Sequence, residues 1–144
     1  MNSEFIEPNH EINWKYSLQN TFHFKQDIER IWLIIRSFEL LCTLSDIGNY
    51  PVIITKGKDS WKEGNEFKGI FLGMVPFVGK VQSKLDLPEM KKIEWLLRTI
   101  NNRYFNLTIE LYKVTENNST VAIKKFQFEN EKMKIEAEKS KIYR

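Results

Sequence analysis

The feature that most constrains the fold is an alternation of apolar and polar residues between Trp14 and Phe24. Every second side chain in this stretch is aromatic or aliphatic, with the single exception of Asn20. Because successive side chains of a β-strand point to opposite faces of a sheet, the alternation predicts a long strand with one buried face.

Further strands, separated by short turns, are predicted from Val52 onward. They read VIITKG, EFKGIFLG, VQSKLDL, KKIEWLLRTI, RYFNLTIELYKV and STVAIKKFQFE. The segment MVPFVGK, which contains Pro76 and Gly79, is predicted to break the chain between two of them. Because parallel neighbours need crossovers of a dozen residues or more, these short connections predict antiparallel pairing.

Helical spacing replaces the alternation at Asp27, where a capping side chain precedes a stripe of apolar residues. The stripe consists of Ile28, Ile31, Trp32 and Ile35. A second short helix is predicted over residues 38–44, a short charged C-terminal helix over residues 130–144, and a polar lead-in over residues 1–11. The expected fold is one α+β domain, residues 1–144. It would be a curved antiparallel sheet of about six or seven strands, with two short helices after the first strand and a C-terminal helix.

Composition narrows the class of protein. The chain has 144 residues and a net charge of +3, and its basic residues are scattered rather than clustered, which argues against nucleic-acid binding. Its one cysteine, Cys42, excludes an intrachain disulfide. Because there is no long apolar run and no secretory signal, we expect a cytoplasmic protein with no transmembrane segment.

Few residues could carry acid–base or nucleophilic chemistry. Cys42, His23 and Asp46 have the residue types of a catalytic triad, but nothing in the sequence brings them together. His23 falls on the polar face of the first strand. With two histidines and one cysteine, a metal site is not expected. We therefore predict no catalytic residue, no metal and no cofactor.

Three polar positions fall on faces that are predicted to be buried. Asn20 is in register with the aromatic residues of the first strand, and Thr99 with those of KKIEWLLRTI. Either Lys124 or Lys125 must face inward in AIKKFQF. A buried polar group without a partner costs about 1–3 kcal/mol, so each of these should have one. The partner is a ligand head group, or else another strand, a water molecule or a bulge.

The order of elements, and the residues between them, resembles the START-like superfamily, also called SRPBCC, helix-grip or birch-pollen-allergen-like. The resemblance runs from about Trp14 to Lys134. It is carried by KQDIERIWLII after the first strand, by SWKEGNEFKG, by LPEMKKIEW and by TIELYKVTENNSTVAIKKFQF. It implies a curved sheet that grips the C-terminal helix, with an apolar ligand held between them.

The leading functional hypothesis is therefore non-enzymatic binding of a lipid or another apolar small molecule. The residues expected to line its cavity are Tyr16, Asn20, Phe22, Trp32, Phe71, Trp95 and Phe126. A core without any ligand would explain the same aromatic residues equally well. The apolar segment 71–77 suggests transient membrane contact as a further possibility.

Two alternatives stay open. The chain could be a protein-partner module that resembles the activators of a chaperone ATPase and acts through the outer face of the sheet. The lysines expected on that face are Lys15, Lys80, Lys84 and Lys124. The chain could instead be an enzyme that resembles polyketide cyclases or dehydrases. Ligand identity and oligomeric state are left undetermined.

Overall fold

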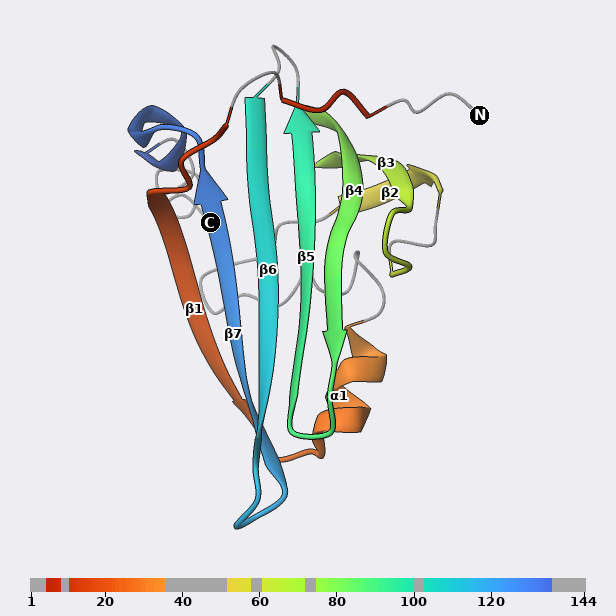
Figure 1. Ribbon diagram of the computed structural model, residues 1–144, viewed down its shortest axis with the longest axis vertical. Helices are drawn as coiled ribbons and strands as arrows, with labels where there is room; N and C mark the ends of the chain where they lie inside the picture. The colour runs from red at the N-terminus through yellow and green to blue at the C-terminus, as the bar shows by residue number, and fades with distance from the viewer. Residues whose placement is uncertain are drawn as a thin grey trace.

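The computed structural model describes residues 5–8, 11–35, 52–57, 61–71, 75–99 and 103–135 (Figure 1). The strands are β1 (Tyr16–Phe24), β2 (Val52–Lys56), β3 (Glu66–Phe71), β4 (Val75–Asp86), β5 (Met90–Thr99), β6 (Arg103–Val114) and β7 (Ser119–Phe128). Helix α1 covers Ile28–Ile34, and a helical turn over residues 131–135 follows β7.

The strands form one antiparallel sheet in the order β1-β7-β6-β5-β4-β3-β2. The strands from β2 to β7 pair as a meander, each with the next along the chain, whereas β1 pairs with β7 at the far edge. This confirms the expected α+β class and the curved antiparallel sheet. The short connections thus predicted the pairing correctly, while the place of β1 is set by contacts distant in sequence.

Helix α1 confirms the first predicted helix. The Asp27 side chain caps it by accepting a hydrogen bond from the backbone N–H of Glu29 at 3.3 Å. Its buried face consists of Ile28, Ile31 and Trp32. The second predicted helix, residues 38–44, lies outside the described residues.

The predicted C-terminal helix is described up to residue 135. Asn130 Oδ1 accepts a hydrogen bond from the backbone N–H of Met133 at 3.0 Å, which caps the first turn. Met133 itself is buried. Within the described ranges, neither this helical segment nor α1 is long and apolar enough to cross a bilayer.

The prediction that MVPFVGK breaks the chain is wrong, because β4 runs through both Pro76 and Gly79. Pro76 pairs with Ile70 of β3, and β4 pairs with β5 only from Phe77 onward. The missing N–H of proline is therefore not needed by β5. At Gly79 a Cβ would lie 2.5 Å from the ring of Phe67, so glycine is required here for packing rather than for a turn.

The main core lies on one face of the sheet, which we call the inner face, and α1 packs against it. The fully buried side chains of this face include Val81, Ile93, Trp95, Leu97, Leu107, Ile109 and Leu111. Trp32 of α1 packs edge-on against Trp61, with ring centroids 4.4 Å apart. Helix α1 lies near the ends of β4 and β5 that meet in a hairpin (Figure 1). One end of the inner face is thus closed by α1.

The opposite, outer face carries a smaller core that the N-terminal segment completes. Phe5 is 5% exposed and packs with Leu96 and Tyr104, the rings of Phe5 and Tyr104 meeting edge-to-face. In Figure 1 the described start of this segment passes over the end of β5. The predicted polar lead-in, residues 1–11, therefore contains a buried aromatic anchor within its described part.

Hydrogen bonds from both backbone and side chains hold this N-terminal segment to the sheet. The backbone N–H of Phe5 donates to Glu66 Oε1 at 3.0 Å, and the Tyr104 hydroxyl donates to the carbonyl oxygen of Ile6 at 2.6 Å. Burial raises the pKa of the Tyr104 hydroxyl, which keeps it a donor over the physiological pH range.

Trp14 does not lie where the alternation predicts. The strand begins at Tyr16, and Trp14 packs with the outer-face cluster around Phe5 instead of facing inward. Its backbone carbonyl accepts a hydrogen bond from Gln127 Nε2 at 3.1 Å. The pattern holds from Tyr16 onward, and the chain before it follows the outer face.

Candidate functional site

The inner face has one part whose side chains are fully buried, which we call the closed part, and another part whose side chains are only half-buried. Trp95 and Leu107, both 0% exposed, are typical of the closed part over β4, β5 and β6. Beside it lie four half-buried aromatic side chains that pack against the edge of the main core, and we call them the aromatic strip. They are Phe22, Phe24, Phe105 and Phe126. The strip spans β1, β7 and β6.

Ring contacts order the strip without closing it. Phe105 and Phe126 meet edge-to-face with centroids 5.8 Å apart, and Phe126 stacks on the buried ring of Phe128 at 5.3 Å. Phe22 and Phe24 of β1 are stacked at 6.3 Å. Such pairs add about 0.5–1.5 kcal/mol each to area burial, so the strip is held in place while part of its apolar surface stays accessible.

The predicted lining residues fall into different environments. Trp32 and Trp95 belong to the closed part, with exposures of 5% and 0%. Tyr16 is half-buried at the start of β1, opposite Phe128 of β7. Trp32 and Trp95 thus belong to the packed core on the inner face. Tyr16 lies at the edge of that face, near the aromatic strip.

Phe71 is placed by its backbone only. It ends β3, paired with Val52 of β2 and Val75 of β4, and its side chain lies outside the described residues. The pairing puts position 71 two residues beyond Gly69, on the opposite side of the sheet from β1. Position 71 thus lies on a strand next to one edge of the sheet, while Tyr16 and Phe22 lie on the strand at the other edge.

Two inward polar residues meet on neighbouring strands. Asn20 of β1 is the direct cross-strand partner of Lys124 of β7, and Lys124 is in turn opposite Ile109 of β6. Lys124 is only 8% exposed, and Asn20 is half-buried. Of the two lysines left open by the sequence, Lys124 is thus the one that faces inward. The two polar positions chosen on separate strands form one polar row that lies between Phe22 and Phe126.

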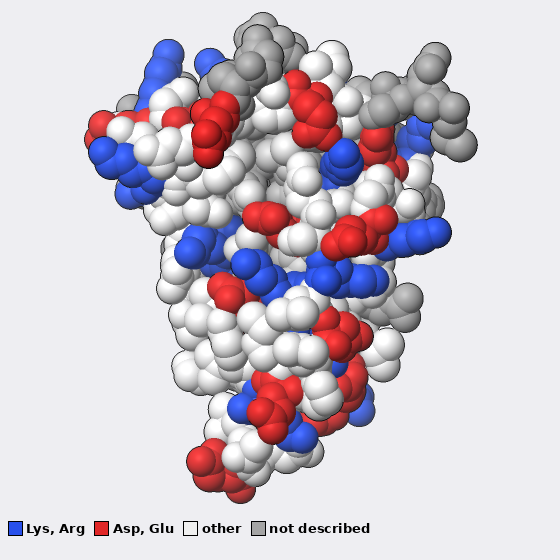
Figure 2. Space-filling view, in the orientation of Figure 1, with Lys and Arg blue, Asp and Glu red and all other residues white. Residues whose placement is uncertain are grey.

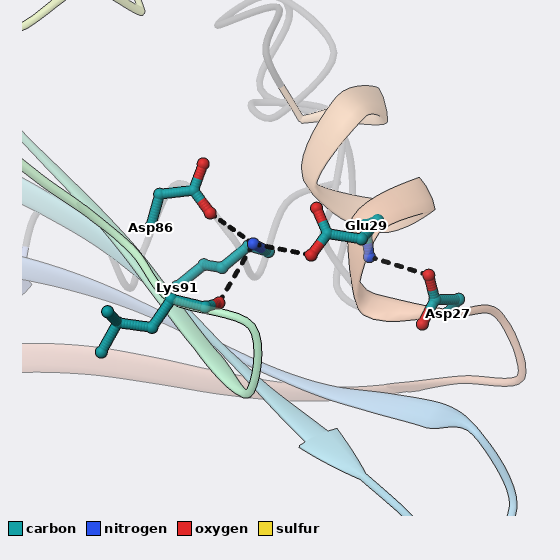
Figure 3. A network of polar contacts seen from close by, with 5 residues as sticks. Asp27, Glu29, Asp86 and Lys91 are labelled. Atoms are coloured by element: carbon teal, nitrogen blue, oxygen red, sulfur yellow. Dashed lines mark hydrogen bonds and ion pairs between the residues drawn. The ribbon is translucent and has the colours of Figure 1, made fainter.

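A second polar cluster, around Lys91, fixes α1 to the β4–β5 hairpin (Figure 3). The Lys91 side chain is 2% exposed, and its Nζ lies 2.9 Å from Glu29 Oε2 of α1. It also forms an ion pair with Asp86 and donates to the carbonyl oxygen of Leu87 at 3.1 Å. Its charge further lies 5.9 Å from the centroid of the Trp32 ring. The contacts with Glu29 and Trp32 tie the helix to the hairpin, and those with Asp86 and Leu87 hold the Lys91 side chain in place within it.

The ionisation states of this cluster reinforce one another. The hydrogen bond from Lys91 holds the pKa of Asp86 below its ordinary value, against the opposing effect of burial. Burial alone would lower the pKa of Lys91, but its hydrogen bonds to Asp86 and Glu29 outweigh that effect and raise it. Both groups are therefore charged at neutral pH. Lys91 and its two carboxylate partners therefore have a structural role: they hold the helix against the sheet.

The Lys91 cluster is not among the sites predicted from the sequence, although the alternation of buried and exposed positions contains a signal for it. Lys91 has the same parity as Ile93, Trp95 and Thr99, so alternation alone places it on the inner face. Thr99, which was predicted to face inward on that basis, is 8% exposed. Applying the same count to Lys91 would have predicted a buried lysine in need of carboxylate partners.

Of the three residues considered for catalysis, His23 alone falls within the described ranges. His23 is exposed on the outer face, as the alternation predicts. Cys42 and Asp46 lie outside the described residues. Within the part of the chain that is described, no group of three or more His, Cys, Asp or Glu side chains could hold a metal ion.

The outer face does not present the lysines as the partner-module hypothesis requires. Lys124 faces inward, and Lys84 is in register with Ile93 on the inner face, its Nζ 5.3 Å from the centroid of the Trp61 ring. Lys80 does lie on the outer face, but it forms an ion pair with Glu7 at 2.7 Å.

The charge distribution over the outer face agrees with this. Figure 2 shows basic and acidic side chains interleaved over the visible face. Glu94, in the middle of the sheet, accepts hydrogen bonds from Ser83 at 3.2 Å and from Asn106 at 2.9 Å. The mild basic excess of the sequence therefore does not gather into a single patch on this side.

Comparison with known proteins identifies the fold. No protein-family model matches the chain, and no curated protein matches it. Among solved structures, hypothetical protein jhp0584 from Helicobacter pylori aligns with a TM-score of 0.65 at 10% identity, over 91% of this chain and 85% of that one. A protein from Arthrobacter aurescens aligns with a TM-score of 0.60 at 14% identity, over 87% and 77%.

CalU16 from Micromonospora echinospora also aligns, with a TM-score of 0.50 at 14% identity, over 84% of this chain and 66% of that one. At such identities the likeness concerns the fold alone. The fold of this chain is therefore shared by these three bacterial proteins.

Proposed function

We propose that this chain is a non-enzymatic, START-like binding domain that holds a lipid or another apolar small molecule on its inner face, beneath the C-terminal helix. One observation carries the proposal: the aromatic strip stays half-buried beside a core that is otherwise closed. Burial of apolar surface contributes roughly 25 cal/mol per Å², so a ligand that covered these rings would gain free energy from each.

The arrangement around the strip supports this reading. Residues 131–135 begin a helix directly after β7, and Met133 of that helix is already buried. In a helix-grip domain the C-terminal helix covers the inner face, and the ligand lies between helix and sheet. The strip would then form one wall of the site, with Trp95 and Trp32 supporting it from the core.

Tyr16, Asn20, Phe22 and Phe126 remain our assignments for direct ligand contact. Phe71 keeps its place among the predicted lining residues. Trp32 and Trp95 support the wall, because their side chains are enclosed by other residues.

Native mass spectrometry of delipidated protein, incubated with a mixture of lipids and apolar aromatic compounds, tests the proposal. We expect a discrete additional mass that denaturing extraction releases unchanged. Phe126→Ala should reduce the bound fraction, because it removes the ring at the centre of the strip. Ile123→Ala, which truncates an outer-face residue of the same strand, should not. A purely apo mass for the wild-type protein after incubation would contradict the proposal.

A further inference from the structure

The two edge strands of the sheet, β1 and β2, differ in how they are protected against pairing with another chain (Figure 1). A free edge offers unpaired backbone N–H and C=O groups, so proteins commonly keep edge strands short, irregular or charged. Strand β2 has 5 residues, a register shift between Ile54 and Lys56, and a lysine at its end. Strand β1 has 9 residues in unbroken register with β7 and contains no proline, lysine, arginine, aspartate or glutamate. The edge formed by β1 is therefore the one suited to accept a further strand.

The hydrogen-bond ladder determines which backbone groups of β1 point away from β7. In an antiparallel sheet, successive residues of a strand bond alternately to the neighbour on one side and on the other. The N–H of Lys113 donates to the carbonyl oxygen of Glu89 at 3.0 Å, so odd-numbered residues of β6 bond toward β5 and even-numbered ones toward β7. Carried through the unbroken registers of β6 with β7 and of β7 with β1, this alternation bonds the even-numbered residues of β1 to β7.

The backbone groups on the free edge therefore belong to the odd-numbered residues of β1. Within the described ranges, no backbone hydrogen bond joins these groups to another segment. Their side chains lie on the polar outer face. They are Ser17, Gln19, Thr21 and His23.

The sequence of β1 has the same polarity when it is read from either end. Its inward residues are apolar except Asn20, which lies at the centre of the strand. If two copies of β1 pair antiparallel about Asn20, Ser17 of each copy lies opposite His23 of the other, and Gln19 lies opposite Thr21. Every outward N–H and C=O of both copies is then paired.

The inward side chains favour this same register. It places Leu18 opposite Phe22 and Tyr16 opposite Phe24 of the other copy, and cross-strand apolar pairs of this kind stabilise a sheet. The nearest registers that also pair the outward groups are shifted by two residues and put Asn20 opposite an apolar side chain. No like charges meet, because β1 carries none of the four charged residue types. The strand is thus complementary to itself.

We propose that β1 pairs antiparallel with β1 of a second copy of this chain, about a two-fold axis at Asn20, so that the two sheets join into one. The interface is isologous, with the same strand contributed by each subunit. It gives Phe22 and Phe24 apolar neighbours from the second copy. The rings of the aromatic strip on β6 and β7 are not part of it, so the dimer does not depend on the proposed function.

Sedimentation velocity at about 1 to 100 µM protein tests the dimer, which should form with a dissociation constant on the order of micromolar. Thr21→Pro removes an outward N–H that β7 does not use, and it should weaken dimerisation at least about tenfold. Thr21→Val keeps that N–H and should dimerise like the wild type. A wild-type monomer at every concentration would overturn the proposal, and so would an unchanged dimer in Thr21→Pro.

Disulfide crosslinking tests the register and does not require the proline variant to fold. In a Cys42→Ser background, Asn20→Cys places two cysteines opposite each other with Cα atoms about 4.5 Å apart, within the range of a disulfide. Mild oxidation should therefore link the two copies, as read on a non-reducing gel. Leu18→Cys, on the same face, lies opposite Phe22 of the other copy and should stay unlinked. Failure of Asn20→Cys to crosslink, or equal crosslinking of both variants, would contradict the two-fold axis at Asn20.

Discussion

Gly79 has no room for a side chain, because the ring of Phe67 lies directly over it. Phe67 is 2% exposed and packs edge-to-face against Phe77, with centroids 6.1 Å apart, so its ring is not free to move aside. A Cβ at position 79 would come within 2.5 Å of that ring. We therefore expect Gly79→Ala to lower the free energy of unfolding by about 1–3 kcal/mol, measured by urea denaturation.

The same contact provides its own control. Phe67→Leu removes the outer part of the ring, so the added methyl group at position 79 should be tolerated better in the double variant. A double-mutant cycle should then show that the two changes destabilise less together than the sum of their single effects. Strictly additive losses would show that the ring is not what excludes a side chain from Gly79.

At the scale of elements, the contact that matters most for α1 is the ion pair and hydrogen bonding around Lys91. Lys91→Met keeps an aliphatic side chain in the buried position and removes the charge. The carboxylates of Glu29 and Asp86 are more than half exposed, so water can solvate them once the lysine is gone. We expect a loss of about 1–3 kcal/mol at neutral pH rather than the larger loss of a fully buried pair. Lys92→Met, on the outer face of the same strand, is the matched control.

The pH dependence of that loss has a definite sign. The pKa of Asp86 is lowered from 3.8 in the folded protein, so its contribution is present above pH 3.8 and is lost as the pH falls through the folded-state value. The pKa of Lys91 is raised from 10.5, so its contribution is present below pH 10.5 and is lost as the pH rises through the folded-state value. The stability difference between wild type and Lys91→Met should therefore be greatest between these limits. A difference independent of pH would contradict an electrostatic role for Lys91.

Elements with strong local patterns were predictable from the sequence. Alternation located β1 and β5 to β7, and apolar spacing with the Asp27 cap located α1. The alternation also placed Asn20 and Thr99 inward. The pairing of Asn20 with Lys124 could not be predicted, because nothing in the local sequence indicates that β1 pairs with β7.

The errors have a common physical origin. Gly79 carries the local signal of a turn, but its role depends on Phe67 in the neighbouring strand. Trp14 continues the alternation of β1, yet it packs with Phe5 on the other face, because the N-terminal segment folds back over the sheet. In each case a contact distant in sequence outweighs a local preference.

At the scale of the whole molecule, Phe5 fastens the start of the chain to the outer face of the sheet. Phe5→Ala should lower the free energy of unfolding by about 3 kcal/mol, because it empties the centre of the outer-face core. Ile6→Ala, where the side chain is 57% exposed, should change it by less than about 0.5 kcal/mol. Urea denaturation of both variants measures this, and equal effects would mean that the segment is not anchored through Phe5.

The pairing of the first strand with the last also has a consequence for synthesis. While β2 to β7 can add to the growing sheet one hairpin at a time, β1 has no neighbour to pair with until Ser119–Phe128 has been translated. At roughly 5–20 residues per second, that delay is on the order of ten seconds. During this delay, the nascent chain contains Phe22 and Phe24 of β1 but not yet the strand with which β1 pairs. Until β7 is made, β1 is therefore an unpaired strand with exposed apolar side chains, which is the kind of segment that favours aggregation.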